Sequence, residues 1–284
     1  MAEADASHRS GRLETTYMRA RRPVVLAVFA HPDDESLACG GTLARLADLG
    51  YSVVLLCVSR GERGGAVESV PASAGDLVEI RKRELDAASQ VLGLQAVHRL
   101  SYPDGNLRWA GGYQLRDDIV RVIRQHRADA VITFDDDGLY WHADHVAVHE
   151  QTSSAVGALG VEAPALYYVT MAPGAMQLVV ERASEKRWVR PSSGVWSIDP
   201  KAFGVATNAP SFALDVRPWV ARKVAALQCH QSQFGAVSPF SLLEASEASA
   251  WLGFEYFRRA PLAGRRERML EGMAAQQSRP LPLV

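Results

Sequence analysis

One stretch of this chain limits its possible folds more than any other: an apolar run that stops abruptly at a cluster of metal-ligand residue types. Val24–Ala30 has the length and continuous hydrophobicity of a strand covered on both faces. The next five residues are His31, Pro32, Asp33, Asp34 and Glu35, and a helix is expected directly after them. We interpret His31 and Asp34 as metal ligands and Asp33 as the group that acts on a water molecule beside the metal.

The first part of the chain alternates strand-like and helix-like segments. Four times, a short apolar run is followed by a longer segment with helical spacing of its apolar residues. This alternation implies right-handed crossovers and a parallel sheet. We therefore predict an α/β fold with a Rossmann-like, mostly parallel sheet flanked by helices. The predicted strands are Val24–Ala30, Ser52–Val58, Ala96–Leu100 and Ala130–Phe134.

The pattern becomes less regular after Pro164. We predict a single α/β domain over residues 23–260, with its core at 23–160 and a C-terminal elaboration at 161–260. The polar residues 1–22 are predicted to be a flexible leader, and 261–284 a loosely held tail. The elaboration is expected to contain strands at Ala165–Thr170, Met176–Val180 and Phe212–Val216, and a helix at Arg217–Gln231.

Charge and composition exclude several classes of protein. A net charge of −1 over 284 residues argues against a nucleic-acid binder, which needs a basic excess. The sequence has no apolar run of about 18 residues, so we predict no membrane span. Its three cysteines are scattered and form neither a disulfide framework nor a zinc motif, which favours a cytoplasmic location. The sequence leaves the oligomeric state open, a homo-oligomer included.

A second group of polar residues follows the fourth predicted strand, at Asp135–His145. In open α/β sheets, ligands bind at the carboxyl ends of the strands where the strand order reverses. If the order is 3-2-1-4, this loop faces the one at His31. The third metal ligand should then be His142 or His145. The other histidine would stabilise an oxyanion or protonate a leaving amine, with Asp144 orienting it.

These motifs together resemble the PIG-L/LmbE-like family of zinc-dependent N-acetylglucosaminyl deacetylases. The resemblance rests on the segment from His31 to Glu35 with the glycines that follow it, and on His142-Ala143-Asp144-His145. It extends from Val24 to Ala158, with softer matches later in the chain. Further motifs that agree, each weak by itself, are Arg81 with Glu84-Leu85, Tyr102-Pro103-Asp104-Gly105, and Lys223 through His230-Gln231-Ser232-Gln233.

The resemblance implies a reaction and a role for each matching residue. The reaction is hydrolysis of the N-acetyl group of a small amino-sugar substrate, which gives a free amine and acetate. The cofactor would be one Zn²⁺ per chain, although another divalent transition metal remains open. The implied metal ligands are His31, Asp34 and His145, and the implied general base is Asp33. His142 would be the electrostatic stabiliser or general acid, with Asp144 as its orienting partner. The implied substrate contacts are Arg81, Asp104 and Tyr140.

Other interpretations of the same residues stay open. The protein could be an amidase acting on a larger acyl group or on a thiol conjugate of a sugar, or a non-catalytic sugar-binding protein. His230 could be a buried structural histidine or a catalytic one. The loop Gly61–Asp76 and the segment Ala172–Pro210 are expected to set substrate specificity, but their shape cannot be predicted from sequence.

Overall fold

The computed structural model describes residues 21–64, 73–110, 112–262 and 268–277. The predicted leader lies outside these residues except at Arg21 and Arg22. The loop 61–76 and the tail 261–284 are described only in part. Within the predicted leader, Arg21 Nη2 lies 2.7 Å from a carboxylate oxygen of Asp129, so this residue is tied to the folded domain.

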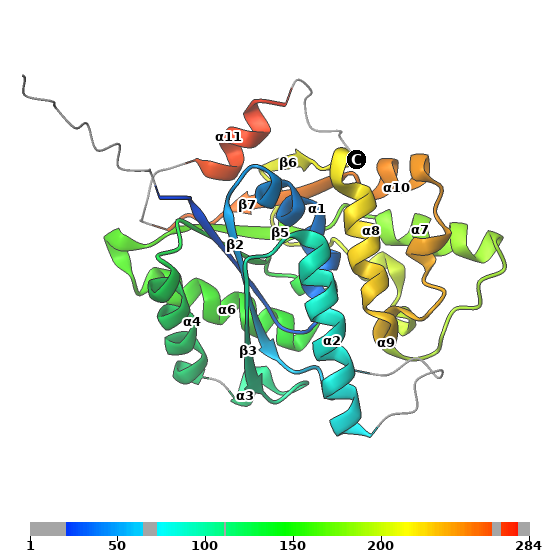
Figure 1. Cartoon of the computed structure of the whole chain (residues 1–284), viewed down its shortest axis with the longest axis horizontal. Coiled ribbons are helices and arrows are strands. Elements are labelled where there is room, and N and C mark those ends of the chain that lie inside the picture. Colours follow the sequence, from blue (N-terminus) through cyan, green and yellow to red (C-terminus); the bar gives the residue numbers. More distant parts are fainter. Residues whose placement is uncertain (1–20, 65–72, 111, 263–267, 278–284) are drawn as a thin grey trace, which may run out of the picture.

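One sheet of seven strands organises the molecule, in the order β3-β2-β1-β4-β5-β7-β6 (Figure 1). β1 to β5 are parallel, whereas β7 is antiparallel to both β5 and β6. The predicted sheet and its order 3-2-1-4 are confirmed, and the antiparallel edge comes from the C-terminal elaboration. The strands are β1 Val24–Phe29, β2 Ser52–Ser59, β3 Ala96–Tyr102, β4 Ala130–Phe134, β5 Ala165–Thr170, β6 Phe212–Asp215 and β7 Phe254–Arg259.

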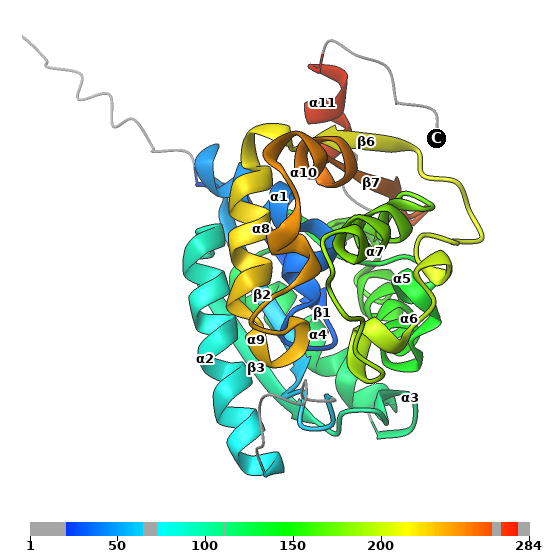
Figure 2. The same cartoon turned by 90° about the vertical axis from the view of Figure 1, so that its right-hand side faces the viewer.

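Helices cover the sheet in two layers (Figures 1 and 2). α1, α2 and α8 pack against one another in one layer, and α4 packs against α6 in the other. In the described part of the chain, no helix is both long and apolar enough to cross a bilayer. The helices are α1 Asp34–Asp48, α2 Ala74–Leu92, α3 Leu107–Ala110, α4 Gly112–His126, α5 Gly138–Trp141, α6 Ala143–Gly157, α7 Ala175–Glu185, α8 Val220–Cys229, α9 Gln231–Phe234, α10 Ala245–Leu252 and α11 Met269–Ala275, with short 3₁₀ helices η1 Gly160–Glu162, η2 Gly194–Ser197, η3 Pro200–Ala202, η4 Arg217–Trp219 and η5 Pro239–Leu242.

The topology brings two distant loops together. From β1 the chain adds β2 and β3 on one side, then crosses back to add β4 and β5 on the other. The strand order therefore reverses between β1 and β4, so the loops after these strands border the same crevice. The residues that follow β1, from His31, and those that follow β4, from Asp135, meet there.

The predicted strand at Met176–Val180 is wrong, because these residues lie in helix α7. The buried side chains of this helix include Met176, Val179 and Ala183, which follow helical spacing. A five-residue window is too short to distinguish this period from that of a strand. The predicted strand at Phe212–Val216 is confirmed as β6.

A kink in α1 ties the C-terminal elaboration to the core. Cys39 has non-helical angles (φ −147°, ψ 31°), which frees the backbone N–H groups that follow it. Glu255 on β7 accepts hydrogen bonds from the N–H groups of Gly41 and Thr42, at 2.9 and 2.7 Å. Lys223 on α8 pairs with the same carboxylate at 2.6 Å. Elements from the last quarter of the chain therefore support the helix that begins at the candidate site.

Candidate active site

The loop after β1 directs its two adjacent aspartates to different places. Asp33 has a φ angle of 136°, which a non-glycine residue rarely adopts, and α1 begins at the next residue. Asp34 folds back, and its Oδ2 accepts a hydrogen bond from the His31 backbone N–H at 2.7 Å. The carboxylate of Asp33 instead lies 3.0 Å from Arg81 Nη2.

The three predicted metal ligands lie together. His31 Nδ1 is 3.1 Å from His145 Nε2, which is 3.2 Å from Asp34 Oδ1, and Asp34 Oδ2 is 3.5 Å from His31 Nδ1. Ligand atoms around one tetrahedral zinc ion at about 2.05 Å lie roughly 3.3 Å apart. Each imidazole nitrogen faces a different oxygen of the Asp34 carboxylate. Two imidazoles and one carboxylate are the donor types of a catalytic zinc site, which leaves a further position for water. All three side chains are buried.

The second nitrogen of each histidine predicted as a ligand has its own partner. His145 Nδ1 lies 2.9 Å from the carbonyl oxygen of Gly138, which can only accept, so Nδ1 carries the proton. His31 Nε2 lies 3.1 Å from Asp104 and 3.3 Å from Asp144. These contacts leave the lone pairs of His31 Nδ1 and His145 Nε2 available for a metal ion beside Asp34.

His142 lies beside the same group. Its ring centroid is 4.6 Å from that of His145 and 5.0 Å from that of His31. Nitrogens of these three histidines lie within 4.8 Å of one another, so an all-histidine set is also brought together. Burial, together with the neighbouring His145 and His31 imidazoles, lowers the pKa of His142 to about 4.

The expected contact between the Asp144 carboxylate and His142 is not found between these two described residues. The carboxylate oxygens of Asp144 accept hydrogen bonds from the backbone N–H groups of Gly105, at 2.6 Å, and Leu107, at 3.0 Å, and one of them lies near His31. The backbone N–H of Asp144, rather than its side chain, donates to His142 Nδ1 at 3.2 Å. As the first turn of α6 directs the Asp144 side chain toward the loop after β3, that carboxylate contacts His31, a predicted metal ligand, instead.

Asp33 lines a cavity that opens next to the predicted metal ligands. Burial raises the pKa of Asp33 to about 6, against the lowering effect of Arg81 and with a further increase from Asp34. Arg81, a predicted substrate contact, lines the same cavity. Its guanidinium group also donates to the carbonyl oxygens of Gly61, at 2.9 Å, and Pro32, at 2.7 Å.

Tyr140, another predicted substrate contact, packs against the site histidines. Its ring centroid lies 5.1 Å from that of His145 and 4.7 Å from that of Phe203. Its flanking residues, Leu139 (φ 67°) and Trp141 (φ 63°), both have left-handed backbone angles. This turn directs the Tyr140 ring inward while Trp141 remains 55% exposed.

A cavity of about 340 Å³ opens onto these groups, and Asp104, the remaining predicted substrate contact, lines it. Several other residues of its wall had no individual role predicted from the sequence. Gln233 belongs to a weak motif match, and the others lie in the loop Gly61–Asp76 or the segment Ala172–Pro210, where no motif or periodicity marks a single residue. These additional lining residues are Arg63, Gly64, Val195, Ser197, Ile198 and Gln233.

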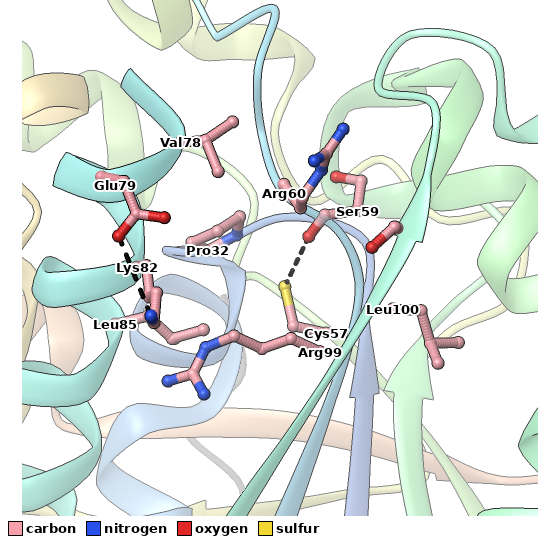
Figure 3. A pocket seen from close by; sticks show the side chains of 11 residues that line it. Pro32, Cys57, Ser59, Arg60, Val78, Glu79, Lys82, Leu85, Arg99 and Leu100 are labelled. Atoms are coloured by element: carbon pink, nitrogen blue, oxygen red, sulfur yellow. Dashed lines mark hydrogen bonds and ion pairs between the residues drawn. The ribbon is translucent and has the colours of Figure 1, made fainter. Parts of the chain in front are cut away.

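A second cavity, of about 180 Å³, lies behind Pro32 between α2 and the ends of β2 and β3 (Figure 3). Cys57 lies in its wall, with Sγ 3.3 Å from the carbonyl oxygen of Ser59. Glu79 and Lys82 on α2 face each other at 3.8 Å across one side. None of the predicted site residues lines this cavity.

Comparison with known sequences agrees with the motifs. The sequence profile of the PIG-L family, described as GlcNAc-PI de-N-acetylase, matches residues 26–156. A 1D-myo-inositol 2-acetamido-2-deoxy-alpha-D-glucopyranoside deacetylase of Acidothermus cellulolyticus is 30% identical over 255 residues, which cover 82% of this chain and 87% of the relative. This chain belongs to the PIG-L family. The resemblance expected from the sequence is thereby confirmed, and PIG-L deacetylases are generally metal-dependent.

Solved structures share the fold of this PIG-L protein. N,N'-diacetylchitobiose deacetylase from Pyrococcus horikoshii superposes with a TM-score of 0.57 at 22% identity, covering 84% of each chain. The 4-carboxy-2-hydroxymuconate hydratase GalB from Pseudomonas putida has a TM-score of 0.58 at 20% identity, covering 84% of this chain and 96% of the hydratase. Because a deacetylase and a hydratase share this fold, the fold alone does not determine the reaction.

Proposed function

We propose that this protein is a zinc-dependent hydrolase that removes the N-acetyl group from an amino sugar of the N-acetylglucosaminyl type. The observation that carries the proposal is the convergence of the donor atoms of His31, Asp34 and His145 beside the carboxylate of Asp33. Relatives support it, because two that are 29% and 30% identical are named deacetylases of a 2-acetamido-2-deoxy-glucopyranoside linked to inositol.

In this proposal, His31, Asp34 and His145 hold the zinc ion, one per chain. A zinc ion held there would supply Lewis acidity to the amide carbonyl and to a water molecule. The carboxylates of Asp104 and Asp144 hold the ring of His31 in place from its other nitrogen. A ligand fixed in this way keeps its lone pair in the direction that metal binding requires.

Asp33 is proposed to take the proton of the attacking water and return it to the leaving nitrogen. With a pKa of about 6, its carboxyl group is ionised at neutral pH and is still basic enough to accept a proton. Arg81 keeps the carboxylate oriented from the side of α2. The proton transfer therefore belongs to a residue that is not among the proposed metal ligands.

His142 is proposed to donate a hydrogen bond to the oxyanion that forms on the substrate. Its Nδ1 accepts a hydrogen bond from the Asp144 N–H, so in the neutral ring the proton is on Nε2. With a pKa of about 4, the ring is neutral at physiological pH. A neutral donor favours the role of oxyanion stabiliser over that of general acid. The sugar is proposed to contact Arg81, Asp104 and Tyr140 in the wall of the cavity.

A panel of amides tests the proposed activity. Zinc-loaded protein is incubated with N-acetylated amino sugars and with analogues carrying larger acyl groups, and free amine and acetate are measured. We expect equal amounts of amine and acetate from an N-acetylglucosaminyl substrate, loss of turnover with a chelator, and recovery when zinc is added. Release of larger acyl groups only would favour an amidase. Folded, zinc-loaded protein that cleaves no amide would refute the proposal.

A cytoplasmic location is proposed for this activity. Cys39, Cys57 and Cys229 are free thiols, the first two buried. A reducing compartment maintains cysteines in this state. Immunoblotting of fractionated cells of the source organism should find the protein in the cytoplasmic fraction, and its recovery elsewhere would reject this location.

A further inference from the structure

Glu35 and His230 form a buried pair directly behind Asp33. His230 Nε2 lies 2.8 Å from Glu35 Oε1, and both side chains have 0% exposure. Glu35 lies in the first turn of α1, whereas His230 lies between α8 and α9. The pair therefore joins the start of the core helix to the C-terminal elaboration, and Figure 1 shows α8 and α9 beside α2.

The second carboxylate oxygen of Glu35 holds the backbone of Asp33. Glu35 Oε2 accepts a hydrogen bond from the Asp33 N–H at 3.0 Å, and Oε1 accepts one from Ser36 Oγ at 2.6 Å. Among the residues that the structure describes, Nδ1 of His230 is buried without a hydrogen-bond partner. The polar interaction of the His230 ring is therefore directed at Glu35.

Asp33 needs such a restraint because its backbone is strained. Its angles (φ 136°, ψ −25°) lie outside the regions that non-glycine residues favour. Strained residues of this kind persist only where their surroundings fix them. Arg81 donates hydrogen bonds to the carbonyl oxygen of Pro32 and to the Asp33 carboxylate, and Glu35 accepts one from the Asp33 N–H.

Stabilisation of the fold alone does not account for this arrangement. Buried ion pairs often contribute no more stability than apolar residues of similar volume. A second buried pair, Lys223 with Glu255, is also attached to α1, where it binds the N–H groups at the kink and not Asp33. Of these two buried pairs, only Glu35 with His230 contacts the residue proposed as general base.

We propose that Glu35 and His230 are positioning residues that fix the backbone of Asp33, so that its carboxylate faces the reacting water. This inference rests on the proposed function, because it takes Asp33 as the general base. Neither residue contacts the metal ligands through its side chain in the contacts described above. Both act on the reaction through Asp33.

Paired substitutions test this role. Glu35→Met with His230→Leu removes both charged groups, and Glu255→Met with Lys223→Leu is the matched control at the other buried pair. We expect the first variant to lower kcat by about 10²-fold, because small displacements of a catalytic group have effects of this size. KM and bound zinc should change by less than about 3-fold. The control should retain kcat within about 3-fold at temperatures where it is folded.

Two further variants separate positioning from general damage. Glu35→Gln keeps an acceptor for the Asp33 N–H and should restore most of the kcat. In an Asp33→Asn background, replacing Glu35 and His230 should lower the residual turnover by less than about 3-fold, because residues that act as a unit are not additive. The proposal would be overturned if the kcat losses from Asp33→Asn and from replacing Glu35 and His230 were fully additive. It would also be overturned if the matched control lost as much kcat as the Glu35 and His230 variant. Glu35→Met alone serves the same comparison if the paired variant does not fold.

A crystal structure of a Glu35→Met variant tests the inference without any assay. Asp33 is expected to leave its positive φ region or to lose its single conformation. Unchanged angles at Asp33 would overturn the positioning role, whatever the protein catalyses. Wild-type protein that cleaves no amide, with Asp33 displaced in the variant, would instead refute the proposed function and leave the restraint of the backbone established.

Discussion

At the residue scale, Asp33 and Asp34 are neighbours in the chain but have different partners. We expect Asp33→Asn to lower kcat by about 10²-fold or more while bound zinc stays near one per chain, because only Asp34 lies among the proposed donor atoms. Turnover and metal analysis on the same preparation check this. Near-normal turnover would contradict the role of Asp33.

The same residue predicts a pH dependence. Asp33 can accept a proton only when ionised, and burial raises its pKa to about 6. Activity should therefore fall as the pH drops below about 6, or at lower pH with zinc bound, since a nearby cation favours the ionised form. The pH profile of kcat/KM measures this acid limb, which Asp33→Asn should lack. An unchanged acid limb in that variant would assign it to another group.

His145 and His149 lie one turn apart on α6 and are a natural comparison. The His145 side chain reaches Asp34, whereas His149 Nδ1 lies 2.9 Å from the carbonyl oxygen of Phe134. We expect His145→Ala to weaken zinc binding by about 10²-fold or more, and His149→Ala to leave it unchanged. Zinc titration with a competing chelator measures both. Full zinc affinity in His145→Ala would exclude it as a ligand.

At the scale of elements, the contact of α1 with the C-terminal elaboration depends on the absence of a side chain at Gly41. A Cβ atom there would lie 2.7 Å from Val216 Cβ, too close for any ordinary contact. We expect Gly41→Ala to lower the free energy of unfolding by about 1–3 kcal/mol. Gly157→Ala in α6, where a Cβ would meet nothing within 4 Å, should instead be neutral or stabilising by up to about 1 kcal/mol. Urea unfolding measures the free energy of unfolding of both variants. Equal values for Gly41→Ala and Gly157→Ala would contradict the packing argument.

At the scale of the whole molecule, the proposed zinc ion would join the loop after β1 to α6. The ligands converge only in the folded chain, so zinc should stabilise it by about 2.7 kcal/mol at a free concentration 100 times Kd. Thermal unfolding with and without zinc should show a higher Tm for the zinc-loaded protein, and His145→Ala should lose most of this increase. A Tm that does not respond to zinc would argue against a metal held in this way.

The sequence by itself determined the alternation of strands and helices and the residue types of the site. Val24–Ala30 and Ala130–Phe134 are continuous apolar runs, which suit buried parallel strands, and both end in clusters of His and Asp. Because parallel strands place their carboxyl ends at one edge, this pattern was enough to predict that the two clusters meet. It was not enough for Met176–Val180, where a short apolar run fits either a strand or a helix.

The tertiary structure alone decided which way each side chain points and which distant residues support it. Asp144 follows His142 closely in sequence, yet its carboxylate is directed to the loop after β3 and to His31. Glu35 meets His230 across 195 positions of sequence, and no local pattern predicts that contact. The spacing of residues along a chain fixes their order and local periodicity, whereas side-chain direction depends on backbone angles and packing that are set only when the whole domain folds.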